Sequence, residues 1–100
     1  MIFVTQLIYI NEGSEAAFHA FEQLAIPLIK KYRGRLLFRL RPEKTAFIAI
    51  DVEPPYEIHL VSFETEENFR QFMEDEERKQ FLYLKEQSIR SAVLIQGKQL

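Results

Sequence analysis

The sequence contains no cysteine and no tryptophan, and only three glycines and four prolines among its 100 residues. The absence of cysteine excludes disulfides, thiolate nucleophiles and cysteine-ligated zinc or iron–sulfur centres. The three glycines form no phosphate-binding loop, and no serine or threonine lies in a nucleophile-elbow motif. No apolar run approaches the roughly 18 residues that cross a membrane, and the N-terminus lacks the basic start of a signal peptide. We therefore expect a cytoplasmic protein that does not enter membranes.

The sequence is rich in large hydrophobic residues. Hydrophobic residues make up 47% of the sequence, including nine phenylalanines and four tyrosines. A chain of this length buries roughly 60–70% of its unfolded surface, which suffices for one core. We predict a single domain over residues 1–100, no cofactor, and a ligand cavity that is shallow or shared with a second subunit.

The charges nearly cancel, with a formal net charge of −2, but they are unevenly placed. Seven of the 13 basic residues lie within residues 30–44, and seven of the 15 acidic residues lie within residues 64–77. The simplest interpretation of Glu74–Glu77 is a solvated turn between helices; the alternative is pairing with the basic segment. A negative net charge without a stacking or helix-turn-helix motif argues against binding to nucleic acid.

The first half of the chain is expected to begin with a strand over Ile2–Ile10, where nearly every residue is apolar or favours β structure. Ser14 then offers an N-cap to a helix that extends to about Tyr32, with apolar residues at three- and four-residue spacing. Pro27 should bend this helix or remove one backbone hydrogen bond. Gly34 should end it.

A second strand is predicted over Arg35–Arg41, where side chains alternate between two faces. We expect Leu36, Phe38 and Leu40 to face the helix and Arg39 to point from the opposite face.

The segment Lys44–Val52 comes after Pro42 and is predicted to be a short strand or an interface flap. Glu53–Pro55 is a rigid break, and Tyr56–Phe63 after it is predicted to be a strand. Thr65 should cap a helix, which an acidic stretch separates from a further helical run through Ile89. A final strand is expected over Ala92–Gln96.

This order of elements predicts an α+β protein with the ferredoxin-like split βαβ sandwich, a four-stranded antiparallel sheet with helices on one face. The other face of the sheet still carries large apolar side chains, so a second subunit or a ligand must cover it. We therefore predict a homodimer in the form of a dimeric α/β barrel.

The segment Tyr32–Arg39, with Pro27 before it and Ile58–Phe63 and Val93–Gly97 after it, resembles the DUF1330 family of small uncharacterised proteins. This family belongs to the dimeric α/β-barrel superfamily. The resemblance implies a ferredoxin-like subunit whose sheet pairs with that of its mate, and it implies no established activity.

Two features depart from the family pattern. Arg33 occupies the position of the first of two glycines before the second strand, and the Lys44–Val52 insert replaces a short polar connection. The family's arginine in the last helix is matched only loosely, by Lys85 or Arg90.

Arg39 is the first candidate for ligand binding, because a guanidinium in the middle of a strand needs a partner when it is buried. That partner is either a carboxylate of the protein, with Glu57 or the acidic stretch as candidates, or an anionic ligand held by two hydrogen bonds.

His59 is the candidate catalytic residue, since a histidine can transfer protons near neutral pH. Its alternative role is that of a hydrogen-bonded core residue. Tyr9 and Gln6 are candidates for the wall of a ligand cavity, whereas His19 is expected to be exposed. The two histidines lack metal-ligand spacing, so no metal site is expected.

The function predicted from these residues is the binding of a small acidic or carbonyl-bearing molecule in a cleft between the sheet and the partner subunit. One alternative is a cofactor-independent oxygenase, isomerase or hydrolase that uses Arg39 and His59. The other is a dimer whose role is purely structural, in which Lys44–Val52 seals the interface.

Overall fold

The computed structural model describes all residues from Met1 to Leu100. Its four strands form one antiparallel sheet in the order β2-β3-β1-β4, as the split βαβ pattern predicts. The elements in chain order are β1 (Ile2–Ile10), α1 (Glu15–Ala25), the 3-10 helix η1 (Ile26–Tyr32), β2 (Gly34–Leu40), the 3-10 turn η2 (Lys44–Ala46), β3 (Glu57–Phe63), α2 (Glu66–Met73), α3 (Glu76–Lys79), α4 (Leu82–Ser88) and β4 (Ile89–Gly97).

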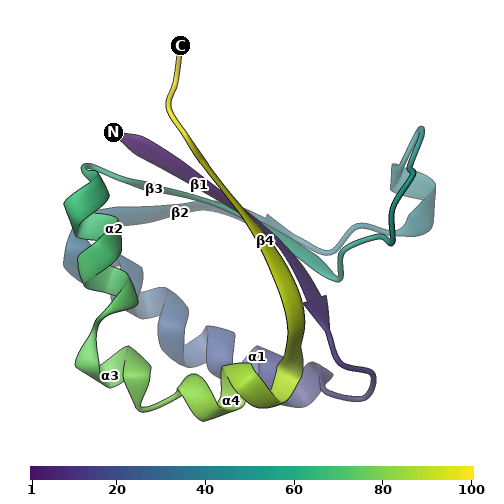
Figure 1. Ribbon diagram of the computed structural model, residues 1–100, viewed down its shortest axis with the longest axis horizontal. Coiled ribbons are helices and arrows are strands. Elements are labelled where there is room, and N and C mark those ends of the chain that lie inside the picture. The colour runs from purple at the N-terminus through teal and green to yellow at the C-terminus, as the bar shows by residue number, and fades with distance from the viewer.

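The helices α1, α2, α3 and α4 lie on the same side of the sheet, and the opposite side of the sheet is uncovered (Figure 1). The predicted ferredoxin-like α+β class is therefore confirmed. The final strand begins directly after α4 and is longer than the predicted Ala92–Gln96. No helix is both long enough and apolar enough to cross a membrane.

The hydrophobic core lies between the sheet and the first helical segment. Phe18 on α1 and Ile8 on β1 are 0% and 1% exposed, because the apolar stripe of the helix covers alternate residues of the strands. The buried apolar residues are Val4, Ile8, Phe18, Phe21, Ala25, Ile29 and Phe63.

The predicted helix changes character one residue before Pro27, where α1 gives way to η1. Proline lacks the N–H that an α-helical turn needs, which explains the change. The helix ends on Arg33, whose φ of 59° is left-handed, and not on the predicted Gly34. Gly34 is needed for close packing instead, since a Cβ there would lie 2.5 Å from Ile29 and 2.6 Å from Phe63.

A β-bulge interrupts the alternation of β2. Leu36 is paired with Val61 and Phe38 with Leu60, so Leu37 is an extra residue with no partner on β3. One extra residue exchanges the two faces of the strand beyond it.

The bulge overturns the predicted facing of three residues. Phe38 and Leu40 lie on the uncovered face, where they remain 47% and 42% exposed. Arg39 is paired with His59 and points to the helix side of the sheet, where it meets the buried Glu57. Its predicted position on the opposite face, toward a partner sheet, is therefore wrong.

The segment between β2 and β3 projects away from the body of the protein (Figure 1). It contains the turn η2 and no strand, so of the two predictions for Lys44–Val52 the strand is wrong. Ile48 and Val52 are fully or largely exposed on this segment.

Candidate functional site

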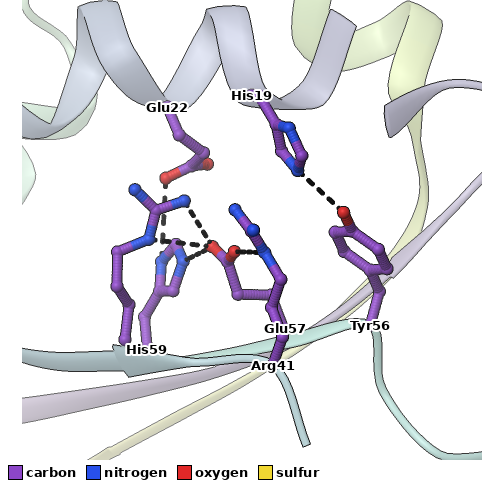
Figure 2. Close-up of polar contacts among 7 residues, drawn as sticks. His19, Glu22, Arg41, Tyr56, Glu57 and His59 are labelled. Carbon is purple, nitrogen blue, oxygen red and sulfur yellow. Dashed lines mark hydrogen bonds and ion pairs between the residues drawn. The ribbon is translucent and has the colours of Figure 1, made fainter. Parts of the chain in front are cut away.

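A cluster of ionisable side chains lies between the sheet and α1. Glu57 and His59 project from β3 toward Glu22 on α1, and Figure 2 shows the three side chains converging. All three are buried, with 1%, 5% and 6% of their surfaces exposed. Buried charged groups are rare unless they are paired, so this cluster is the most unusual feature of the interior.

Glu57 is held by three donors. Arg39 donates to its Oε2 atom from Nη2 at 2.9 Å and from Nε at 3.2 Å, and Arg41 donates to Oε1 at 2.7 Å. His59 also hydrogen-bonds to Oε2. Burial alone would raise the pKa of Glu57, but the hydrogen bonds from His59, Arg41 and Arg39 outweigh it and lower the pKa to about 2. Glu57 is therefore a carboxylate at neutral pH.

The ionisation of Glu57 determines which nitrogen of His59 carries a proton. A carboxylate only accepts hydrogen bonds, so Nε2 of His59 must donate to it. In the neutral ring, Nδ1 then carries the lone pair, and it lies 3.8 Å from Oε2 of Glu22. Burial raises the pKa of Glu22, although His59 partly opposes this. The distance between Nδ1 and Oε2 exceeds that of a direct hydrogen bond.

A cavity of about 60 Å³ adjoins this cluster, between the sheet and the helices. His59 and Glu22 form part of its wall, together with Gln6, which neighbours His59 on β1. Most of the remaining wall is apolar. The apolar lining consists of Val4, Phe21, Ala25, Ile26, Ile29, Val61, Phe63, Phe69, Phe72 and Met73.

Arg78 on α3 is the fourth polar residue of the cavity wall, and it is only 6% exposed. Its guanidinium lies over the rings of Phe21 and Phe72, 5.8 and 5.2 Å from their centroids. The cavity therefore has a carboxyl–imidazole pair and a guanidinium in an otherwise apolar wall, which is typical of small-molecule sites.

Asp75 fixes the position of Arg78. Its carboxylate caps α3 by accepting the backbone N–H of Arg78 at 2.8 Å, and it also binds Tyr32 and, at 3.0 Å, Lys31. Asp75 is 3% exposed, so the predicted solvated turn is wrong at this residue. The alternative, pairing with the basic segment, is confirmed by the bond to Lys31.

Asp75 is expected to make the stability of the fold depend on pH. The hydrogen bond from Tyr32 is the largest cause that lowers its pKa, from 3.8 to about 2. A folded-state pKa below the unfolded value means that the stabilisation is complete above about 3.8 and is lost as the pH falls toward 2. We predict that Asp75→Asn, which retains a capping group, reduces this acid dependence in urea unfolding. Asp75→Ala should in addition lose about 1–2 kcal/mol at neutral pH. An unchanged acid dependence in both variants would contradict the assignment.

The structure brings together some of the predicted site residues and separates others. His59 and Gln6 line the same cavity. Arg39 adjoins His59 but forms the ion pair with Glu57, the first of its two predicted alternatives. Tyr9 lies elsewhere, where its hydroxyl donates to the carbonyl of Glu53 at 2.9 Å. The cavity is on the helix side of the sheet and not on the side predicted to meet a partner.

His19, predicted to be exposed, is half-buried and hydrogen-bonds to the hydroxyl of Tyr56 at 2.7 Å (Figure 2). The two rings stack with centroids 6.0 Å apart. Neither residue lines the cavity.

Glu22, Glu57 and His59 also have the composition of a metal site, with one ligand atom of each within 4.8 Å of the others. Both oxygens of Glu57, however, already accept hydrogen bonds from Arg39 and Arg41. Two neighbouring guanidinium charges disfavour a further cation. The cluster is therefore better suited to holding a proton than a metal ion.

Glu22 and Arg78 were not predicted as site residues. Glu22 lies in an ordinary helical sequence, and only its spacing of one and four residues from Phe21 and Phe18 places it near the buried side. Arg78 follows four acidic residues, a context typical of a solvated surface. Its burial depends on the short helix α3 folding back over the cavity, which the sequence pattern does not reveal.

Comparison with solved structures supports the fold. The protein RPA0582 of unknown function from Rhodopseudomonas palustris has a TM-score of 0.84 at 14% identity, covering 99% of this chain and 82% of that chain. A NIPSNAP family protein of unknown function from Agrobacterium tumefaciens, Atu4242, has a TM-score of 0.72 at 20% identity, covering 99% and 87%. A dimeric protein of unknown function and ferredoxin-like fold from Bacteroides fragilis has a TM-score of 0.72 at 9% identity, covering 97% and 94%.

The TM-scores establish a shared fold, described as ferredoxin-like for the Bacteroides fragilis protein, and at these low identities no shared activity follows. No family model matches the sequence, and no curated protein matches it. The resemblance to the DUF1330 family therefore stays a prediction.

Proposed function

We propose that the protein binds a small acidic or carbonyl-bearing molecule in the cavity beside His59. The observation that carries the proposal is the cavity wall itself, in which Gln6, Glu22 and His59 meet a largely apolar lining. Apolar walls exclude water and bind the carbon skeleton, while a few polar groups orient the functional group. The location replaces the predicted cleft between the sheet and a partner.

A second candidate function, catalysis of proton transfer, follows from the arrangement around His59. Glu57 accepts a hydrogen bond from Nε2–H of His59 and thereby fixes the ring, which leaves Nδ1 as the base. Nδ1 removes a proton from the carbon next to a ligand carbonyl, and protonated Glu22 supplies one to another carbon, as in a cofactor-independent isomerase. The proton stays within the pair of groups, so this reaction needs no oxidant or cofactor.

Arg39 takes part in this proposal as a positioning residue. Its guanidinium neutralises Glu57, and it does not line the cavity. The same holds for Arg41. The ligand-binding role predicted for Arg39 is thereby replaced by support of the Glu57–His59 pair.

The binding proposal is tested by thermal shift with short carboxylic acids, amides and ketones, because a ligand of the native state raises its melting temperature. We expect at least one compound class to stabilise the wild type, and His59→Asn to weaken that stabilisation. Arg70→Gln, a change of an exposed residue on α2, should leave it unchanged. The absence of stabilisation by every class would contradict the proposal.

We also infer that two copies associate through the uncovered sheet face, as in a dimeric α/β barrel. On one edge strand, Phe38 and Leu40 are 47% and 42% exposed. On the other edge strand, Val93 and Ile95 are 47% and 53% exposed. An apolar surface of this extent is unusual on a monomer. The dimeric ferredoxin-like protein from Bacteroides fragilis supports a second copy as the occupant.

A further inference from the structure

The guanidinium of Arg78 is buried without a carboxylate partner. No acidic side chain forms an ion pair with it. Its Nη1 atom donates to the carbonyl of Met73 at 3.1 Å, and its Nε atom is buried with no hydrogen-bond partner. Among the buried side-chain nitrogen and oxygen atoms, this Nε is the one left without a partner.

A buried guanidinium with an unpartnered Nε destabilises the fold unless a ligand accepts its hydrogen bond. An unsatisfied buried donor costs about 1–3 kcal/mol, and a buried unpaired charge costs more. The rings of Phe21 and Phe72 offset part of that cost but accept no conventional hydrogen bond. Burial also lowers the pKa of Arg78, although the nearby charges of Glu22 and Asp75 partly oppose this shift. A guanidinium placed this way in a cavity wall is suited to an anionic ligand.

We propose that Arg78 binds the carboxylate of a small organic acid, which identifies the ligand class of the cavity. This inference rests on the proposed function, since it needs the cavity to be a ligand site. The planar guanidinium presents paired N–H donors that match a carboxylate. The ligand carbon skeleton would then extend along the apolar wall toward Glu22 and His59.

Glu22 is the one acidic residue in the cavity wall, and it constrains this arrangement. Its charge would repel a carboxylate, but burial raises its pKa and thereby favours its neutral form. The arrangement therefore requires Glu22 to be protonated when the acid is bound, with its O–H donating a hydrogen bond to the ligand.

The size of the cavity limits the length of the acid. About 60 Å³ accommodates roughly four water-sized groups, which corresponds to an acid of two or three carbons. Phe69, Phe72 and Met73 in the wall are half-buried, and methionine side chains adapt readily. Acetate and propanoate are therefore suitable probes, and the amide of each is a neutral control of nearly the same shape.

The test compares carboxylate and amide binding by isothermal titration calorimetry. We expect wild type to bind propanoate roughly ten- to hundredfold more tightly than propanamide, the difference that a charged hydrogen bond confers. Arg78→Met should abolish that preference, and Arg78→Lys should retain part of it. Arg70→Met, which removes an exposed arginine of α2, is the matched control and should keep the full preference.

The stability of Arg78→Met provides a second readout. Replacing an unpaired buried charge with an apolar side chain of similar length is nearly neutral or stabilising. We therefore expect its melting temperature to equal or exceed that of the wild type. A large decrease would indicate that Arg78 has a structural role, and the carboxylate-to-amide comparison in wild type would then decide the proposal by itself.

Each result of the titrations bears on one of the two proposals. Equal binding of acids and amides would overturn the role of Arg78 and leave the proposed function standing. Equal carboxylate preference in wild type and in folded Arg78→Met would also overturn it. Binding of neither class would overturn both proposals and indicate a cavity that holds only water.

Discussion

Glu57→Gln is expected to destabilise the fold by about 3 kcal/mol, the lower end of the cost of breaking a buried ion pair. The lower end applies because the side chains of Arg39 and Arg41 are 31% and 48% exposed and can turn toward water. The side chain of His59 is only 6% exposed, so it cannot turn toward water when its partner is lost. For a domain of this size, that loss lowers the melting temperature by roughly 12–24 °C.

The control for this prediction is Glu64→Gln. Glu64 pairs with Arg33 on the surface, where both side chains are more than half exposed, so its loss should cost only about 0–1 kcal/mol. Urea unfolding of both variants and of His59→Asn would measure the difference. If Glu57→Gln were as mild as Glu64→Gln, the buried network would not be holding His59 in place.

Phe38→Glu is expected to convert the proposed homodimer into a monomer. The side chain lies on the uncovered face and is 47% exposed in the single subunit, so a charge there would be buried on association. The cost of burying an unpaired charge, several kcal/mol, corresponds to a hundredfold or greater weakening of the dimer. Size-exclusion chromatography with light scattering would measure the mass of each variant.

Leu24→Glu is the matched control, because Leu24 is similarly exposed, at 41%, on α1 and away from the sheet face. We expect wild type and Leu24→Glu to be dimers at micromolar concentration. A monomeric wild type would overturn the dimer proposal, and a dimeric Phe38→Glu would place the interface on another surface.

The architecture could be predicted from the sequence because its signals are local. The apolar run of Ile2–Ile10 gave the first strand with its observed bounds, and the spacing of Phe18, Phe21 and Ala25 gave the buried side of α1. Turn residues and prolines predicted the ends of the later strands and helices to within a few residues of the observed ends. These signals depend on neighbouring residues alone.

The bulge at Leu37 could not be predicted in the same way. Leu36, Leu37 and Phe38 are all apolar, so either facing of the strand satisfies the pattern. The bulge therefore changes the face on which Arg39 lies, and Arg39 pairs with Glu57, one of the partners that the sequence left open.

The site required contacts between distant parts of the chain. Glu22 meets His59 across the layer between α1 and β3, and Arg78 reaches the cavity only because Asp75 ties α3 to Tyr32 and Lys31. Each of these acidic and basic residues is ordinary in its own sequence neighbourhood. Their proposed roles depend on the burial of their side chains. In a helix as short as α3, the apolar periodicity is too brief to predict which side chains are buried.

The most direct test of the ligand site beside His59 is a titration followed by nitrogen-15 NMR of the imidazole rings. The chain has only two histidines, so both can be followed separately. His59 lines the cavity, whereas His19 bonds to Tyr56 outside it. With propanoate added, we expect saturable shifts of the His59 ring nitrogens while those of His19 stay constant. Shifts that are absent, or that are equal and non-saturating for both histidines, would contradict it.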